Sequence, residues 1–397
     1  MMTQISLRER LLRAFSDDAP AQQAQALRET PIVALGPQST LGLAHLGELM
    51  RRGARIVLAV DDYCRDAELH GVPVCSSAQA AYELARRLSA GQRAVAVDFT
   101  LQPYTQSRFG ALARHLGLVQ RDLLELLAAY GMPGVYEPVL QYRERTAARA
   151  DDWLALAERL DDEASRQTLY ALLLQRLELN RHVLDGVLLG PRDEYFGPGA
   201  HSETFIAGCR EHFVDCGAHR GTVVAKLLGA SGWQVAGIDA FEPDAENFAA
   251  LNQLVPAVLP VALPNLRTHQ CAVAERSQTL RFAQTGTMGS HVSETGGVTV
   301  RCVALDDVVE RASFIKMDVE GYEARALRGA AGLLAREQPR LAIAAYHYAT
   351  DLLDICQALH ELLPGHRLRL RQHCSYFYDA IVYATPRHDW LPLESAA

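Results

Sequence analysis

Short apolar runs that alternate with stretches of helical spacing are the feature that most constrains the fold of this chain. In the N-terminal part each apolar run has the length of a strand, and the segments 41–52 and 78–88 between the runs have apolar residues at helical spacing. Such alternation is typical of a parallel, doubly wound α/β sheet. The runs lie at residues 32–35, 55–60, 71–74 and 94–97.

A second alternating pattern fills the C-terminal half and predicts a larger sheet. The predicted strands lie at residues 213–216, 235–238, 268–273, 314–317, 341–345, 368–370 and 380–384. The last two have too little chain between them for a long helix, so we expect them to pair antiparallel and to close the sheet. The glycine-rich segment 280–303 is predicted to form a β-hairpin, and the proline-containing stretch 247–266 is predicted to be a loop.

The region between the two patterns has leucine and alanine at helical spacing, and we find no convincing strand from residue 108 to residue 189. Residues 1–30 should form one or two short amphipathic helices. The sequence therefore predicts three parts. These are a smaller Rossmann-like α/β domain at residues 1–107, a helical connector at 108–193, and a larger α/β domain at 194–397.

Composition and charge exclude several classes of function. The chain has 397 residues and a formal net charge of −8, so nucleic acid is not an expected partner. Its eight cysteines are scattered without a Cys-x-x-Cys pair, which indicates reduced thiols rather than a zinc site. The N-terminus lacks the pattern of a secretory signal, and no stretch suits a membrane helix. We expect a cytoplasmic protein with no membrane partner, and the sequence leaves the oligomeric state open.

The first predicted strand of the C-terminal sheet ends in an Asp-x-Gly-Ala-x-x-Gly motif. Gly217 allows a tight turn without a Cβ, Ala218 keeps the approach of a ligand open, and Gly221 lets the next helix pack near the strand. Ligands bind at the carboxyl ends of strands in such sheets. Because the motif carries an acid, Asp215, it suits a cationic or hydroxyl-rich nucleoside ligand better than a pyrophosphate.

The second strand of this sheet supports the same prediction of a nucleoside ligand. It ends at Glu242, where a carboxylate is placed to accept hydrogen bonds from both hydroxyls of a ribose. The distance from the first motif fits one β-α-β unit. Asn247 follows soon after, and it could support the same ligand or lie on a helix face. Both residues are predicted cofactor contacts.

The fourth strand ends in three charged residues, which are Lys316, Asp318 and Glu320. Buried charges must be paired or hydrogen-bonded, and this edge of the sheet lies over the ligand crevice, so a functional site is favoured over a structural ion-pair cluster. Two histidines are further catalytic candidates, since His347 follows the fifth strand and His373 lies in the closing hairpin. Glu323 is expected on the surface of the helix that follows the charged motif.

These residues resemble the FkbM family of methyltransferases, from about residue 194 to residue 385. The most distinctive stretch is 315–323, where the sequence matches the family's Lys-x-Asp-x-Glu-Gly-x-Glu pattern. The other matching stretches are 194–198, 213–218, 341–347, 371–373 and 378–384. The resemblance implies a class I, Rossmann-like methyltransferase sheet of five parallel strands with an antiparallel closing hairpin.

The resemblance also implies S-adenosylmethionine as the cofactor and O-methylation of a sugar, a polyketide or a related small molecule. Our first hypothesis for removal of the hydroxyl proton is a general base among Asp318 and His347, with Lys316 and Glu320 orienting it or the substrate. The alternative is a hard cation bound by Asp318 and Glu320. We favour the metal-free version because Lys316 already supplies positive charge.

Two other classes of protein stay open. The chain could be an inactive binding or scaffold protein that keeps the methyltransferase fold, although the complete set of motif residues argues against this. It could also be a nucleotide-binding oxidoreductase that uses the N-terminal sheet, but the turn at residues 36–42 lacks the middle glycine of a dinucleotide site. In the C-terminal hairpin, Ser290 and His291 are candidates for contact with the substrate.

Overall fold

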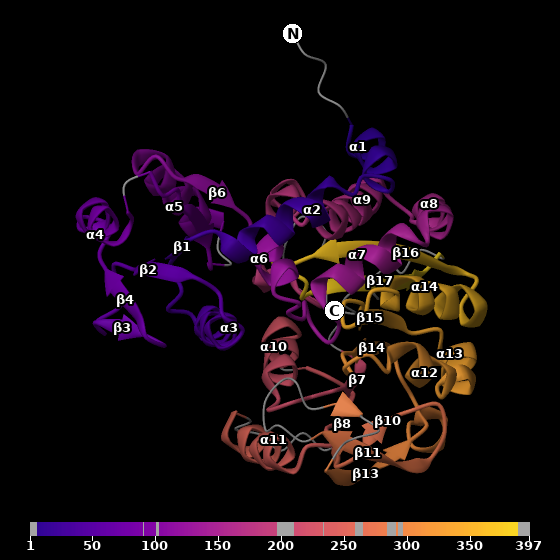
Figure 1. The fold of residues 1–397 in the computed structure, drawn as a ribbon. Coiled ribbons are helices and arrows are strands. Elements are labelled where there is room, and N and C mark those ends of the chain that lie inside the picture. The colour runs from indigo at the N-terminus through magenta and orange to yellow at the C-terminus, as the bar shows by residue number, and fades with distance from the viewer. Residues whose placement is uncertain are drawn as a thin grey trace. The chain divides into compact units, whose positions relative to one another are not determined.

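The computed structural model describes residues 6–89, 91–100, 103–196, 210–232, 234–258, 265–283, 291–292 and 297–387. The chain divides into two compact units, and we describe each by itself (Figure 1). The first unit comprises Met1–Ala150, Gln167–Leu188 and Cys374–Phe377, and the second comprises Asp151–Arg166, Leu189–His373 and Tyr378–Ala397.

The first unit contains a six-stranded sheet, drawn in indigo and purple in Figure 1. The strand order is β3-β4-β2-β1-β5-β6, and all neighbours are parallel except β3 and β4. The strands are β1 (Ile32–Leu35), β2 (Ile56–Val60), β3 (Glu68–Leu69), β4 (Val72–Cys75), β5 (Val95–Asp98) and β6 (Val119–Arg121). Helices α3 (Thr40–Arg51), α4 (Ala80–Arg87) and α5 (Pro103–His115) join them, so the predicted doubly wound sheet is confirmed.

The expectation of no strand between residues 108 and 189 is wrong at β6. This strand pairs in parallel with β5, and Val119 lies opposite Val95. It is short, largely polar and at the sheet edge, so it leaves no apolar period in the sequence. The helical elements of the chain up to residue 193 are α1 (Leu7–Ala14), α2 (Ala19–Gln25), η1 (Ala26–Glu29), α6 (Leu123–Ala129), α7 (Val139–Ala147), α8 (Ala150–Arg159), α9 (Glu163–Glu178), η2 (Arg181–Gly186) and η3 (Pro191–Asp193), besides those joining the sheet.

The second unit contains a seven-stranded sheet of order β16-β17-β15-β14-β7-β8-β9. Five strands are parallel, and β17 pairs antiparallel with both β15 and β16, so the closing hairpin is confirmed. The strands are β7 (His212–Cys216), β8 (Gly237–Phe241), β9 (Leu266–His269), β14 (Phe314–Met317), β15 (Arg340–Ala344), β16 (His366–Gln372) and β17 (Ala380–Pro386). The α-helices that connect the strands of this sheet include α10 (Thr222–Ala230), α11 (Ala245–Val258), α12 (Glu323–Arg328), α13 (Ala331–Glu337) and α14 (Asp351–Leu362).

Two sequence predictions for this unit are wrong. The stretch 247–266 was expected to be a loop, but its first part belongs to α11. Asp244 caps that helix, since its Oδ1 accepts hydrogen bonds from the amides of Glu246 and Asn247, and Pro256 comes only in the last turn. The run 268–273 was expected to be one strand, but it is divided between β9 and β10 (Ala272–Val273), which lie in different sheets.

The predicted hairpin in segment 280–303 is confirmed and is part of a second, four-stranded sheet. Strands β11 (Gln278–Ala283) and β13 (Val298–Val303) pair antiparallel, with Leu280 opposite Val300. Strand β12 (His291–Val292) pairs with β11, and β10 pairs with β13. After β9 the chain forms the small sheet, from β10 to β13, and then returns to the main sheet at β14.

Three phenylalanine rings fix the centre of the large sheet. Phe196, Phe213 and Phe314 are buried and pack edge to face, with ring centroids between 5.6 and 6.1 Å apart. Such pairs contribute about 0.5–1.5 kcal/mol beyond their buried area. Because Phe213 lies on β7 and Phe314 opposite it on β14, this packing holds side by side the two strands that carry the charged motifs.

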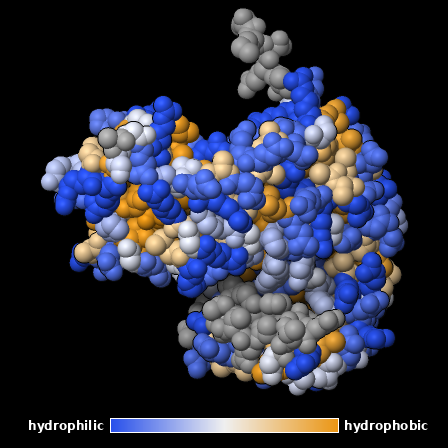
Figure 2. All heavy atoms as spheres, viewed as in Figure 1, coloured by the Kyte–Doolittle hydropathy of each residue, from blue (hydrophilic) through white to orange (hydrophobic). Residues whose placement is uncertain are grey.

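The visible surface is largely hydrophilic, with hydrophobic residues in separate patches (Figure 2). Within the described ranges, none of the helices combines the length and the apolar character needed to cross a membrane.

Candidate functional site

The turn after β7 needs glycine at two positions. Gly217 has φ +79°, and a Cβ there would lie 1.8 Å from the carbonyl oxygen of Asp318. Gly221 has φ +86° and caps α10. The amides of Gly217 and Ala218 donate to the carbonyl of Phe241 at 3.0 and 2.9 Å, which ties this turn to the end of β8. The motif therefore forms a tight cradle at the carboxyl edge of the sheet.

Lys316 holds this turn from β14. Its Nζ lies 3.2 Å from Asp215 Oδ1 and donates hydrogen bonds to the carbonyls of Gly217 at 2.7 Å and Cys216 at 3.4 Å. Lys316 is buried and Asp215 is fully buried. Burial alone would lower the pKa of Lys316, but the charges of Asp215 and Asp318 raise it, so the ammonium stays charged. Burial raises the pKa of Asp215, against the charge and the hydrogen bond of Lys316, which lower it.

The predicted ribose acid stands on the other side of the same turn. Glu242 Oε2 accepts a hydrogen bond from the amide of His219, and Oε1 accepts one from the amide of Asp244, both at 2.8 Å. Burial raises the pKa of Glu242 to about 7 against these two hydrogen bonds. Asn247 is buried, and its Oδ1 accepts a hydrogen bond from Arg220 Nε at 3.2 Å. The structure thus brings all the predicted cofactor residues to one loop cluster.

The charged motif after β14 surrounds His347 with carboxylates. Nε2 of the histidine lies 3.3 Å from Asp318 Oδ1 and 3.3 Å from Glu320 Oε2. Nδ1 lies 3.4 Å from Glu323 Oε1 and 3.9 Å from Asp351 Oδ2. The ring is fully buried. Each nitrogen can donate to the carboxylates that it faces only if it carries a proton. Burial raises the pKa of Glu323 to about 7, although the charge of His347 lowers it.

The protonation state of His347 decides whether it can act as the general base. Burial alone would lower its pKa, but the Glu323 charge and the hydrogen bonds with Asp318 and Glu320 hold the pKa of His347 well above its usual range. A histidine that is already protonated has no lone pair to accept a hydroxyl proton, so the geometry argues against His347 as the general base. Burial would raise the pKa of Asp318, but His347 and Lys316 lower it, which keeps this carboxylate ionised.

The sequence missed two members of this cluster. Glu323 was expected on a helix surface, but it is 1% exposed and faces His347. Its Oε1 accepts hydrogen bonds from the amides of Val319 at 2.8 Å and Gly321 at 3.3 Å. Asp351 opens α14 after the fifth strand, and its Oδ2 accepts a hydrogen bond from the amide of Tyr348 at 2.8 Å. The acidic residue in the last position of the 315–323 motif was the available signal for Glu323.

A chain of hydrogen bonds reaches Asp318 from the opposite side. The hydroxyl of Tyr195 donates to Asp318 Oδ2 at 3.1 Å, and the amide of Tyr195 donates to the hydroxyl of Tyr383 at 3.0 Å. His373 Nε2 lies 3.0 Å from that same hydroxyl, and its Nδ1 lies 3.2 Å from the carbonyl of Gly190. Burial lowers the pKa of His373 to about 4, so the ring is neutral, with Nδ1 donating to the carbonyl of Gly190 and Nε2 accepting from the Tyr383 hydroxyl. The structure does not place His373 against the carboxylates.

Removal of the Tyr383 hydroxyl tests this chain. Tyr383→Phe leaves the buried amide of Tyr195 and one nitrogen of His373 without a partner, so we expect the free energy of unfolding to fall by about 1–3 kcal/mol. The measurement is urea denaturation. The control Tyr82→Phe removes the hydroxyl of a residue that is 66% exposed and should change stability by less than about 0.5 kcal/mol. Equal losses of stability in Tyr383→Phe and Tyr82→Phe would contradict a stabilising role for these hydrogen bonds.

A metal ion at this cluster has a limited donor set. Ligand atoms of Asp318, Glu323 and His347 lie within 4.8 Å of one another. Glu323 Oε1, however, already accepts two backbone hydrogen bonds, and the imidazolium of His347 supplies the positive charge that the carboxylates need. The arrangement therefore fits a protonated histidine better than a cation bound by carboxylates.

A hollow of about 180 Å³ lies beside Glu242, between the end of β8 and the small sheet. It is lined by Pro243, Ala245, Gln270, Phe282 and residues 298–301. The lining mixes apolar side chains with an amide and a guanidinium. Of the two hairpin candidates for substrate contact, Ser290 lies outside the described residues, and His291 is described only as part of the backbone of β12.

The strand order, the closing antiparallel hairpin and the glycine turn define a Rossmann-like methyltransferase of the class I type. Residues 215–375 match the sequence profile of the methyltransferase FkbM domain. The crystal structure of a methyltransferase FkbM from Methylobacillus flagellatus KT is similar, with 26% identity and a TM-score of 0.78 over 96% of this chain and 99% of that chain.

A fibrillarin from Aeropyrum pernix, solved with natively bound S-adenosyl-L-methionine, is 15% identical and covers 56% of this chain and 76% of its own. Its TM-score against this chain is 0.30. No curated protein matches the chain.

Proposed function

We propose that the second unit binds S-adenosylmethionine at the carboxyl ends of β7, β8 and β14. The observation that carries this proposal is the convergence of the glycine turn with two buried carboxylates, Asp215 and Glu242, at one edge of the sheet. Glu242 offers acceptors for ribose hydroxyls, and Asn247 supports the turn through Arg220. The hollow beside Pro243 has a lining that suits a planar base. When bound, this cofactor supplies a methyl group on a sulfonium.

The proposed acceptor is a hydroxyl of a sugar, a polyketide or a related small molecule. Besides burial, the charges of three acidic side chains, Asp318, Asp379 and Glu320, all raise the pKa of Tyr346, and this negative charge disfavours a phosphorylated acceptor. Burial, together with the charges of Glu194 and Asp318, raises the pKa of Asp379 to about 7. A carboxyl group near its pKa can both accept and donate a hydrogen bond, as recognition of a hydroxyl requires.

In the proposed reaction the acceptor oxygen takes the methyl group and gives its proton to a carboxylate. Asp318 is the candidate for this task, because Tyr195 and His347 hold its two oxygens and keep it ionised. Lys316 fixes the turn of the cofactor site rather than touching the acceptor. Most of the rate gain should come from alignment of the two reactants.

Calorimetry with S-adenosylmethionine and S-adenosylhomocysteine tests the cofactor. We expect micromolar binding, about −8 kcal/mol, in the wild type and strong weakening in Asp215→Ala and Glu242→Ala. A well-folded wild type that binds neither compound would overturn the proposal. The same titration tests the alternative of an inactive scaffold protein. A parallel titration with nicotinamide dinucleotides tests the oxidoreductase alternative. Transfer of a labelled methyl group to neutral and phosphorylated sugars then tests the acceptor class.

Binding of S-adenosylhomocysteine should depend on pH through Glu242. The carboxylate must be ionised to accept hydrogen bonds from two hydroxyls, and its pKa is raised to about 7. Affinity should therefore rise by roughly fivefold to tenfold between about pH 6 and about pH 8, as expected for a single ionisation in that range. Calorimetry at several pH values measures this.

The matched control is Glu242→Gln, which keeps the shape and one acceptor but has no ionisation. Its affinity should be weaker and should not show the same rise with pH. The effect of the proton on folding has the opposite direction. A carboxyl group whose pKa is raised on folding stabilises the folded state at acid pH, and this contribution is lost as the pH rises towards about 7. A rise in affinity that persists unchanged in Glu242→Gln would assign it to another group.

A further inference from the structure

We propose that Glu323 and Asp351 are positioning residues that hold His347 as a doubly protonated imidazolium, and that this fixed cation orients Asp318 and Glu320 as the proton-accepting pair. The role in proton transfer rests on the proposed methyl transfer, whereas the geometry around His347 is independent of that function. It assigns to the cluster two acids that take no part in cofactor binding.

The ring of His347 is held between two pairs of carboxylates. On the Nε2 side are Asp318 and Glu320, each 3.3 Å away, and on the Nδ1 side are Glu323 at 3.4 Å and Asp351 at 3.9 Å. Tyr346 packs against the ring with centroids 4.2 Å apart. A neutral ring would direct a lone pair at one of the two carboxylate pairs. The doubly protonated form directs an N–H group at each pair.

The two acids on the Nδ1 side are anchored by the backbone. Glu323 Oε1 accepts from two amides of the turn that carries Glu320, so the acid behind the ring also shapes the loop in front of it. That turn is constrained, since Glu320 has φ +60° and a Cβ on Gly321 would lie 2.3 Å from the ring of Tyr348. Asp351 is held by the amide of Tyr348. The side chains behind the ring therefore have little freedom to turn away.

The acids in front of the ring are the ones that an acceptor would meet. The side chains of Asp318 and Glu320 are each 22% exposed, whereas those of Glu323 and Asp351 are 1% and 11% exposed. Asp318 receives a second hydrogen bond from Tyr195. The imidazolium thus lies behind the rim, where it orients the two rim carboxylates without touching substrate.

The first experiment reads the ring directly. The full chain is labelled with ¹⁵N-histidine, and the His347 signals are identified by their loss in His347→Gln. We expect both ring nitrogens to stay protonated between about pH 5 and pH 8, the range in which an ordinary histidine loses its charge. A bare nitrogen on His347 within this range in the wild type would overturn the proposal. Because no methyl transfer is needed, this result stands apart from the proposed function.

The decisive variant is Glu323→Gln. Its Oε1 can still accept the hydrogen bonds of Val319 and Gly321, so the turn is kept while the charge that faces Nδ1 is removed. We expect His347 to begin to lose its proton within the same pH range in this variant. Glu83→Gln, in helix α4 of the first unit, is the control and should leave the His347 signals unchanged. Identical His347 titrations in wild type and Glu323→Gln would contradict the proposal.

Kinetics provide the second readout. With an acceptor in hand, Glu323→Gln and Asp351→Asn should lower kcat by roughly tenfold at alkaline pH while leaving KM for the acceptor nearly unchanged, because proton transfer rather than binding is affected. In these variants the fall in kcat at alkaline pH should follow the titration of His347. A uniform loss at every pH would indicate a structural role only. Activity that is abolished by chelation and restored by a divalent cation would also overturn the proposal, since a histidine bound to a metal cannot be doubly protonated.

Discussion

Lys316→Met should lower the free energy of unfolding of the second unit by about 3–5 kcal/mol, the usual cost of removing one partner from a buried ion pair. The methionine fills similar space but leaves Asp215, which is fully buried, without its counter-charge. It also removes the hydrogen bonds to the carbonyls of Gly217 and Cys216. We therefore expect loss of cofactor binding as well. Hydrogen exchange of the β7 and β14 amides in denaturant measures the stability, and calorimetry measures the binding.

A second variant separates charge from packing. In Asp215→Asn/Lys316→Met the unpaired charge is gone, so much of the stability should return while cofactor binding stays weak. Lys226→Met is the matched control, because Lys226 is partly exposed and its partners among the described residues include the carbonyls of Pro191 and Glu194 rather than a buried carboxylate. If the double variant is as unstable as Lys316→Met alone, the uncompensated charge is not the cause of the loss.

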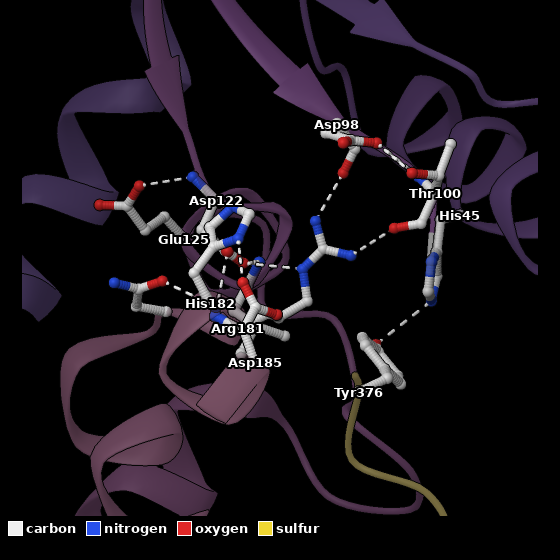
Figure 3. A network of polar contacts seen from close by, with 11 residues as sticks. His45, Asp98, Thr100, Asp122, Glu125, Arg181, His182, Asp185 and Tyr376 are labelled. Atoms are coloured by element: carbon white, nitrogen blue, oxygen red, sulfur yellow. Dashed lines mark hydrogen bonds and ion pairs between the residues drawn. The ribbon is translucent and has the colours of Figure 1, made fainter. Parts of the chain in front are cut away.

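Arg181→Met should have an effect of similar size in the first unit, again about 3–5 kcal/mol. Figure 3 shows the guanidinium of Arg181 at the centre of a polar network at the end of β5. Its Nη2 donates to the carbonyl of Asp98 at 2.7 Å, its Nη1 to the carbonyl of Thr100 at 2.9 Å, and its Nε to Asp122 Oδ1 at 3.1 Å. The side chain is 1% exposed, so water cannot replace these partners.

The control for this variant lies in the same unit. Arg108 pairs with Asp62 near the surface, and their side chains are 43% and 22% exposed. Exposed pairs contribute about 0–1 kcal/mol, so Arg108→Met should be nearly neutral. Hydrogen exchange of the β1 and β5 amides, followed in denaturant, reports on this unit alone. Equal losses in the two variants would mean that the network around Arg181 contributes no more than a surface pair.

Much of the second unit could be predicted from the sequence, because its turns and strands are determined by short stretches of residues. The turn at residues 215–221 has glycine at two positions with strongly positive φ, Gly217 and Gly221, and β14 is apolar apart from Lys316, as is typical of a buried parallel strand. The candidate site residues also fell at strand ends, and parallel strands bring those ends to one edge. The polar strand β6 and the capped helix α11 had no such signal, so they were missed.

The partners within the site could not be predicted, because they depend on register and on loops that return from far along the chain. Lys316 lies opposite Asp215 in the pairing of β14 with β7, and the sequence does not state that register. Glu323 meets His347 only after the chain has passed through two helices and β15. The protonation of His347 follows from the carboxylates that surround it, whereas the sequence suggested His347 as a candidate general base.

The burial of Lys316 has a practical consequence for labelling. Lys226 and Lys316 are the only lysines of the chain. An amine-selective reagent can reach Lys316, which is 2% exposed, only when the end of β14 opens. The rate at which Lys316 is modified therefore reports local opening of the turn, with Lys226 as an internal reference. A ligand that binds the closed turn should slow that rate, so the native chain carries its own reporter for ligand discovery.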